Sequence, residues 1–279
     1  MKRQALFLSS FVVLCCALAS SQAPSAHRKP KPKPTSTSNQ DFTPSCTNPS
    51  LPGPATTIDT LCGLDGAGTQ AEAKQNEAKN NFCATGTPET YTVDQFANLQ
   101  NQVTNTKGIN FGDQNTPTRQ KGPTTDRTPL QQMGEGKLVV FQGYVLNARQ
   151  EGAESVNCGP PPRIPNAPEN HDIHISLGQA ASDSECSGIV AEMIPHHRPT
   201  VWTATNVLKV KNASTPVRVT GQLMFDSSHL PCAAGKPIRT NPARVSLWEV
   251  HPIYKFEVCT ADCTTNGQWV SLEEWLRSH

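Results

Sequence analysis

Histidines are concentrated in the C-terminal half of this 279-residue chain. Six of the eight lie between positions 171 and 251, and four carboxylates are interleaved with them: His171, Asp172, His174, Glu192, His196, His197, Asp226, His229, Glu249 and His251. Imidazoles combined with one or two carboxylates and an open coordination position suit zinc, iron or manganese. Such a site could activate water or polarise a substrate.

Spacing narrows this set only partly. Glu249 and His251 are two residues apart, so in a strand they share a face, whereas His171 and His174 would point to opposite faces. We take His174, His229, His251 and Glu249 as candidate metal ligands, with Glu192 or Asp226 as a possible base. The remaining members, namely His171, Asp172, His196 and His197, are candidates for the rim of a ligand site together with Glu192 and Asp226.

Structural roles also account for these histidines and carboxylates, without a metal or catalytic site. The sequence contains no His-Glu-x-x-His motif and no Gly-x-Ser-x-Gly nucleophile elbow. Histidines can cap strand ends or bond backbone carbonyls. Glu192 and Glu249 lie among apolar residues and could pair with Arg218 or Arg244, because a buried charge needs a partner. The catalytic residues therefore stay unassigned.

The elements that would position these side chains are mainly β-strands. Apolar and polar residues alternate, or apolar residues cluster, in segments 137–149, 171–177, 189–194, 217–226 and 245–258. Residues 200–209 predict a helix or helical turn, and residues 271–277 a short helix. The order strand, strand, strand, helix, strand, strand is that of the OB-fold, a five-stranded barrel. A β-sandwich is the alternative. In the barrel we expect the loop after the first strand and the loop between the last two to share one rim, where the candidates would meet.

Three segments carry a resemblance to known sequences. Residues 151–158 (EGAESVNC), 171–174 (HDIH) and 248–253 (WEVHPI) resemble stretches of uncharacterised exported bacterial proteins with an OB-like barrel domain. The resemblance spans about residues 90–260. It implies export and the barrel, and it implies no known activity.

The first residues have the pattern of a secretory signal peptide, which we assign to 1–19. Lys2 and Arg3 precede an apolar run over 5–18 and a small-residue exit at 17–19. The run is too short to cross about 30 Å of hydrocarbon, and no later segment is apolar for long enough. We expect a periplasmic or extracellular protein. A lipid anchor is not expected, because Leu14 or Cys15 would precede the modified cysteine.

Eight cysteines follow the signal peptide, an even number typical of disulfides in an exported chain. The barrel topology favours Cys158 with Cys232, and Cys186 with Cys259 or Cys263. The cysteine left over would join Cys46, Cys62 and Cys83, where a Cys62–Cys83 bridge could clip a helix over 71–82. Eight cysteines nevertheless allow 105 pairings. A zinc site of paired cysteines is not expected, because Cys259 and Cys263 have no matching second pair.

Composition divides the rest of the chain into three regions. Residues 20–60 are rich in Pro, Ser and Lys and predict a disordered linker, which could make weak contacts with anionic envelope polymers. Residues 61–130 predict a small helical and irregular region. Its clearest helix is 93–105, where Thr92 and Gln95 form a capping box and Tyr91 can pack on Phe96. Residues 131–279 contain the barrel.

The sequence thus predicts an exported, disulfide-stabilised binding or envelope-associated module of unknown ligand. One alternative is a metal-dependent hydrolase using a divalent metal such as zinc. The other is an OB domain that binds nucleic acid or oligosaccharide through aromatic side chains, namely Phe141, Tyr144, Trp202, Trp248 and Tyr254. Nucleic acid is not expected, because the net charge is only +1 and aromatic residues in strands more often belong to the core.

Overall fold

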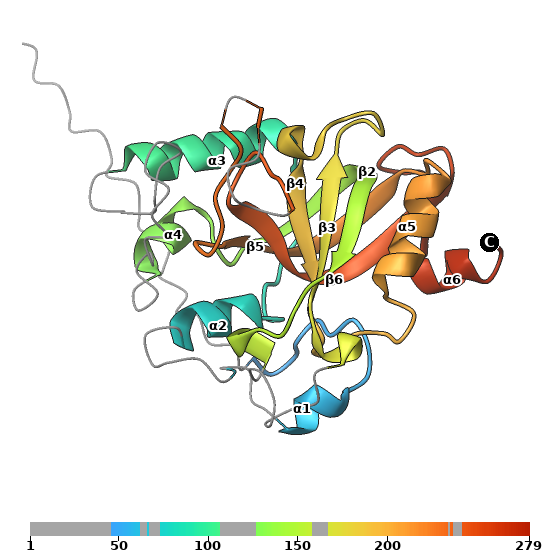
Figure 1. Cartoon of the computed structure of the whole chain (residues 1–279), viewed down its shortest axis with the longest axis horizontal. Helices are drawn as coiled ribbons and strands as arrows, with labels where there is room; N and C mark the ends of the chain where they lie inside the picture. Colours follow the sequence, from blue (N-terminus) through green and yellow to red (C-terminus); the bar gives the residue numbers. More distant parts are fainter. Residues whose placement is uncertain are drawn as a thin grey trace, which may run out of the picture. The chain divides into compact units, whose positions relative to one another are not determined.

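Five strands close into a β-barrel in the computed structural model (Figure 1). The structure describes residues 46–61, 66, 73–106, 127–157, 167–233, 235, 236 and 242–279, all within one unit, Asn39–His279. The expected signal peptide and residues 20–45 of the linker lie outside these ranges. The elements are α1 (Thr57–Leu61), α2 (Ala73–Lys79), β1 (Glu89–Tyr91), α3 (Val93–Asn105), α4 (Thr128–Met133), β2 (Leu138–Gln150), β3 (Ile173–Gly178), β4 (Ile189–Met193), α5 (Ala204–Asn212), β5 (Val217–Phe225), β6 (Trp248–Ala261), β7 (Gln268–Ser271) and α6 (Leu272–Leu276).

The barrel strands pair in the order β2-β3-β4-β6-β5, and β5 closes the ring by pairing with β2. All of these pairings are antiparallel except that of β4 with β6, which is parallel. The helix α5 lies between β4 and β5 in the chain. The mainly β, five-stranded class predicted from the sequence is therefore present, and this order is consistent with an OB-like barrel.

The long strand β2 serves both sides of the barrel. Residues 138–143 pair with β5, and residues 144–150 pair with β3. The change of partner occurs at Gly143, where a Cβ atom would lie 2.1 Å from the carbonyl oxygen of Gly178. Only glycine allows the two backbones to approach this closely.

Strand alternation fills the barrel with apolar side chains. Inward positions of β3 and β4 are fully buried, among them Ile173, Ile175, Leu177, Ile189 and Ala191. The helix α3 adds Phe96, Leu99 and Val103 to the same core. Its capping box at Thr92 and Gln95 and the contact of Tyr91 with Phe96, at 5.5 Å between ring centroids, confirm the prediction for this helix.

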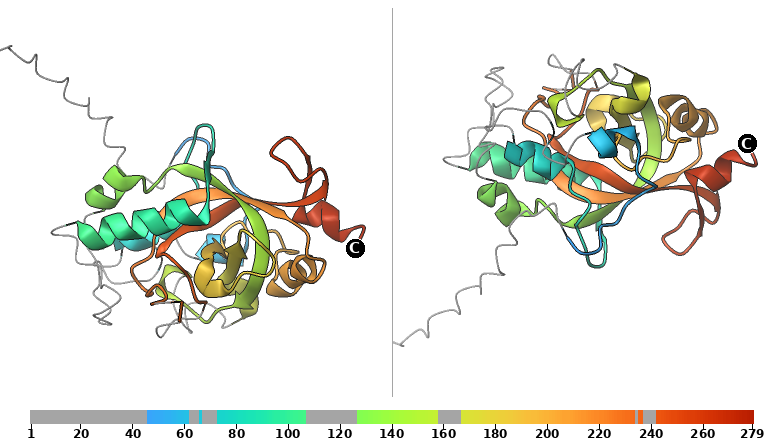
Figure 2. Two further views of the ribbon diagram at one scale, coloured as in Figure 1. Left: turned by 90° about the horizontal axis from the view of Figure 1, so that it is seen from above. Right: turned by 90° about the horizontal axis from the view of Figure 1, so that it is seen from below.

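The helices surround the barrel. Figures 1 and 2 show α3 and α4 on the side opposite to α5 and α6. The sequence analysis missed two short strands, β1, which runs parallel to β2, and β7, which pairs with β6. Within the described ranges, no helix is long and apolar enough to cross a membrane.

Residues 46–60, which composition assigned to the linker, are folded. Cys46 is bonded to Cys83, the amide of Ser50 donates to the carbonyl of Phe82, and Ile58 of α1 is fully buried. Asp59 accepts from the amide of His197 and lies 2.7 Å from Nδ1 of His196. A disulfide and the hydrogen bonds of the half-buried Asp59 therefore hold a segment that is poor in large apolar residues.

The disulfide predictions need correction. Cys46 pairs with Cys83, Cys186 with Cys232, and Cys259 with Cys263. The predicted partners Cys62 and Cys158 lie outside the described residues, and their proposed bonds to Cys83 and Cys232 are wrong because those cysteines are bonded elsewhere.

The physical reason is the parallel pairing of β4 with β6. It places the start of β6, and with it the loop 226–247, beside the start of β4. There the amide of Val245 donates to the carbonyl of Gly188. The loop after β2 leaves from the other end of β3, where Gln150 pairs with Ile173. Cys186, just before β4, therefore meets Cys232.

Candidate metal centre

A cluster of ionisable side chains lies on the outer face of β3, β4 and β6. His174 of β3 and Glu192 of β4 are directly paired across the two strands. Ala191 pairs with Val250 of β6, so Glu249 and His251 flank the same position. Because strand residues alternate between faces, the inward positions of Ala191 and Val250 turn these polar neighbours outward.

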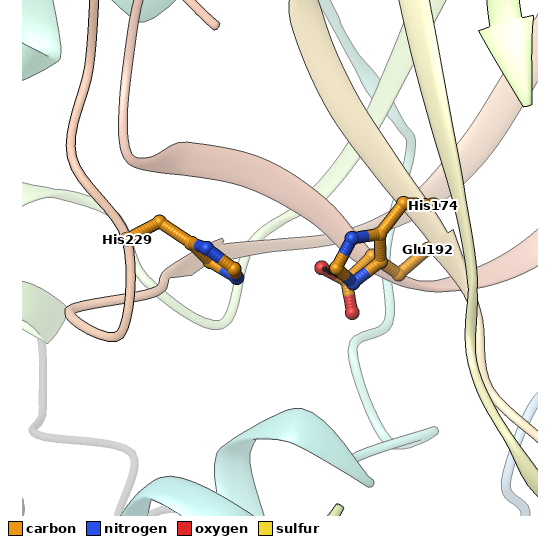
Figure 3. A group of neighbouring side chains, drawn as sticks. All are labelled: His174, Glu192 and His229. Atoms are coloured by element: carbon orange, nitrogen blue, oxygen red, sulfur yellow. Dashed lines mark ion pairs between the residues drawn. The ribbon is translucent and has the colours of Figure 1, made fainter. Parts of the chain in front are cut away.

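The first group consists of His174, Glu192 and His229. Nε2 of His174 lies 2.9 Å from Oε1 of Glu192, and the three residues present ligand atoms within 4.8 Å of one another. His229 comes from the loop 226–247, and its ring points toward the other two side chains (Figure 3). Within the described ranges, no fourth side chain joins this group.

The second group shares Glu192 and adds Glu249 and His251. Nδ1 of His251 lies 2.9 Å from Oε2 of Glu192 and 3.3 Å from Oε1 of Glu249. All three side chains are fully buried. Nη1 of Arg244 donates to Oε2 of Glu249 at 2.8 Å, which is the arginine partner that the structural alternative predicted.

Close distances in this cluster do not all correspond to hydrogen bonds. Neither oxygen of Glu192 and neither ring nitrogen of His174 has an aligned hydrogen-bond partner among the described residues, although their mutual distance is 2.9 Å. Buried polar atoms in native proteins are nearly always bonded. The polar atoms of Glu192 and His174 are therefore close to one another without forming aligned hydrogen bonds.

The helix α2 and residues 226–229, the start of the loop after β5, lie against the cluster. Nζ of the buried Lys79 lies 3.0 Å from Oδ2 of Asp226 and 3.5 Å from Glu154. Nε2 of Gln75 donates to the hydroxyl of Ser228 at 3.0 Å. These contacts hold the start of the loop, which carries His229, against α2.

Electrostatics within the cluster favour bound cations. Burial alone would lower the pKa of His174 and His251, but the surrounding carboxylates, chiefly Glu192, outweigh it. The pKa of His251 rises to about 10. Burial and the charges of Glu154 and Glu192 raise the pKa of Asp172 to about 7. The raised pKa values of both histidines show that positive charge is favoured beside Glu192.

His229 shows the opposite shift. Burial and the guanidinium of Arg244 lower the pKa of its imidazole. A neutral imidazole has a free nitrogen lone pair, the form that binds metals.

Three of the six clustered histidines converge on Glu192, namely His174, His229 and His251, together with the candidate ligand Glu249. His196 and His197 instead contact Asp59. His171 belongs to neither of the two ligand groups found among the described residues. Asp172 is fully buried, and neither of its oxygens has a hydrogen-bond partner in this part of the chain.

The two residues named as possible bases have other partners. Asp226 accepts from the amide of Ser228 and forms an ion pair with Lys79, so its carboxylate is engaged. Glu192 lies at the centre of both ligand groups, in the position of a ligand. Arg218, the other arginine considered for bracing, pairs with Glu257.

Sequence reasoning missed four members of the site. Glu151 lies 3.2 Å from Nδ1 of His174, Lys79 and Gln75 reach the site from α2, and Glu154 lies 3.5 Å from Lys79. No local signal identifies Lys79, because its role depends on how α2 packs against the barrel. Glu151 follows directly after β2 and pairs by its amide with the carbonyl of Asp172, so strand adjacency could have placed it near His174.

The aromatic residues considered for base stacking are mostly interior. Phe141 and Trp248 are fully buried, and Trp202 and Tyr254 are nearly so. Phe141, Trp202 and Trp248 belong to the main core, and Tyr254 belongs to a second, smaller cluster. Tyr144 is half-buried.

Comparison of the chain with protein-family models, curated proteins and solved structures finds no match.

Proposed function

We propose that this protein is an exported, disulfide-stabilised, metal-dependent hydrolase whose metal is bound by His174, Glu192 and His229. The observation that carries the proposal is the convergence of two imidazoles and one carboxylate, from two strands and a loop, within 4.8 Å. Export is supported by the signal-like N-terminus and by three disulfides among the described residues. We further propose kinship with the exported bacterial proteins that residues 151–158, 171–174 and 248–253 resemble.

The ligand types favour zinc in a reactive site. Structural zinc sites use four protein ligands, whereas catalytic sites use three, such as two histidines and a glutamate, and leave one position open. A metal held in this way supplies a Lewis acid that can polarise a carbonyl or phosphoryl oxygen. Glu151 beside Nδ1 of His174 would fix the ring orientation, as carboxylates beside metal-binding histidines do.

The location supports a ligand site as well. In OB-like barrels the face of the second and third strands, bordered by the loops after strand one and strand four, is the usual ligand surface. Here those strands are β3 and β4, and Glu151 and His229 come from the two bordering loops. The side chains of Glu151 and His229 are 25% and 19% exposed, so the solvent-facing border of the group lies on this side.

Metal analysis with a matched pair of variants tests the proposal. His229 and His197 have similar exposure, 19% and 21%, and each lies near one aspartate, at 3.6 and 3.7 Å. We expect the wild-type protein to retain stoichiometric zinc, His229→Asn to lose at least about tenfold in zinc affinity, and His197→Asn to bind as the wild type does. Equal affinities in all three proteins would contradict the assignment.

Activity is tested on the zinc-loaded protein with phosphoesters, carboxylic esters and peptides. Turnover that disappears in His229→Asn but persists in His197→Asn would establish the hydrolase. Stoichiometric zinc without turnover of any of these substrates would leave the binding module as the function.

A further inference from the structure

Glu192 contacts a different histidine through each of its two carboxylate oxygens. Oε1 lies 2.9 Å from Nε2 of His174, and Oε2 lies 2.9 Å from Nδ1 of His251. The carboxylate is fully buried, and neither oxygen has an aligned hydrogen-bond partner among the described residues. A carboxylate placed in this way can bridge two metal ions, one on each oxygen.

The Oε2 side holds a ligand set of its own. Glu192, Glu249 and His251 present ligand atoms within 4.8 Å of one another, and all three are fully buried. Glu249 and His251 belong to one strand and face the same way, so the backbone of β6 fixes their separation. The two sets share only Glu192, because the second set contains neither His174 nor His229.

The surroundings of the second set orient its members. Arg244 donates to Oε2 of Glu249, which leaves Oε1, the atom 3.3 Å from His251, directed toward the set. Nε2 of Gln222 donates to the carbonyl of His251 and holds β6 at this point. Ligating carboxylates and histidines in metal sites are characteristically supported by such outer hydrogen bonds.

The cluster has an excess of negative charge. Six carboxylates and three fixed cations give it a formal charge of −3 with neutral histidines: Glu151, Glu154, Asp172, Glu192, Asp226 and Glu249 against Lys79, Arg198 and Arg244. Unpaired charge in a buried site is costly, so divalent cations bound here would reduce this excess.

We infer that Glu192 bridges two divalent metal ions, one bound with His174 and His229 and the other with Glu249 and His251. This inference rests on the proposed function, because it shares the first metal with it. Two metals about 3.5–4 Å apart are suited to displacement reactions in which both the attacking and the leaving oxygen are stabilised. The second ion would lie deeper than the first, because all three of its ligands are fully buried.

The test measures how many equivalents of Zn²⁺ and Mn²⁺ bind to the full, disulfide-bonded protein. The same measurement is made on the variant His251→Asn and on the control variant His196→Asn. His196 is a buried histidine that contacts Asp59 outside the cluster. We expect two equivalents of zinc in the wild type and in His196→Asn, and one in His251→Asn. With two equivalents of Mn²⁺, the wild type should give an exchange-coupled electron paramagnetic resonance spectrum, which His251→Asn should lose.

The outcomes separate this inference from the proposed function. Saturation of the wild type at one equivalent, lost in His229→Asn, would overturn the bridge and retain the single-metal site. Two equivalents in both the wild type and His251→Asn would place the second ion elsewhere and also overturn it. No binding in the wild type would overturn both proposals. If His251→Asn does not fold, as judged by circular dichroism, Glu249→Gln replaces it and is expected to bind one equivalent.

Discussion

Nδ1 of His174 lies 3.2 Å from Oε1 of Glu151, while Nε2 of the same ring faces Glu192. A histidine that binds metal through one nitrogen commonly has a carboxylate beside the other, which sets the tautomer and increases the basicity of the ligand. Glu151 therefore acts on the proposed metal through His174.

Replacing Glu151 tests this role. Glu151→Gln should lower zinc affinity by about tenfold without changing the number of ions bound, because the ring loses its negative partner but keeps its position. Competition with a chromophoric chelator measures the affinity. Glu154→Gln is the matched control, since Glu154 is similarly exposed (31% against 25%) but contacts Lys79. Equal losses in both variants would show a general charge effect.

The ion pair of Lys79 with Asp226 predicts a large stability effect. Both side chains are buried and 3.0 Å apart, so Lys79→Met leaves the Asp226 carboxylate uncompensated. We expect a loss of about 3–5 kcal/mol in the free energy of unfolding, measured by urea denaturation. Adding Asp226→Asn should recover part of the loss, because the unpaired charge is then removed.

The exposed pair of Lys137 with Glu89 is the comparison. Its side chains are 48% and 52% exposed, so Lys137→Met should cost less than about 1 kcal/mol. If Lys79→Met costs no more than Lys137→Met, the buried pair does not stabilise the contact between α2 and the loop 226–247.

The barrel was predictable because its signal is local and repeated. Alternation in β3 and β5, the glycine in β2 and the capping box of α3 each depend on residues close in the chain. The elements that were missed are short, such as β1 and β7, and are stabilised by pairing with distant strands rather than by their own pattern.

The sequence indicated which residues could form the site, but not how these residues are arranged. Two-residue spacing correctly put Glu249 and His251 on one face, but it could not reveal that Glu192 lies between them and His174. That arrangement follows from the pairing of Ala191 with Val250, a contact between strands far apart in the chain. The same parallel pairing explains why Cys186 bonds Cys232, so one unpredicted strand pairing accounts for both outcomes.

Stability in acid should depend on Glu185. Burial alone would raise the pKa of this carboxyl group, but hydrogen bonds from Arg149, Asn147 and Ser176 outweigh it and lower the pKa from 4.5 to about 2. Because the folded-state pKa is depressed, the stabilisation is complete above about pH 4.5 and is lost as the pH falls toward 2.

Glu185→Gln should therefore be less stable than the wild type at pH 6 by about 1–2 kcal/mol, allowing for solvent screening of a partly exposed group. The difference should vanish near pH 2. Urea denaturation of both proteins at a series of pH values measures it. A difference that is constant from pH 6 to pH 2 would mean that packing of the side chain, not its charge, is responsible.

The disulfide between Cys186 and Cys232 should stabilise both the fold and the metal centre. It closes a chain separation of 46 residues, whereas Cys259 and Cys263 are separated by only 4. By loop-closure entropy, replacing both cysteines with serine should cost about 4 kcal/mol for the first bond and about 2 kcal/mol for the second. Urea denaturation gives both values.

Only the first replacement should also weaken zinc binding. Cys232 belongs to the loop 226–247, which carries His229, and the disulfide ties that loop to the residues just before β4, the strand of Glu192. Without the disulfide the loop keeps more conformational freedom, and zinc binding must remove that freedom to fix His229 at the centre. In the native protein this entropy is already lost on folding. Zinc affinity should therefore fall in the Cys186→Ser, Cys232→Ser protein and remain unchanged in the Cys259→Ser, Cys263→Ser protein. Unchanged zinc affinity in both would show that α2, through Lys79 and Gln75, is sufficient to hold the loop in place.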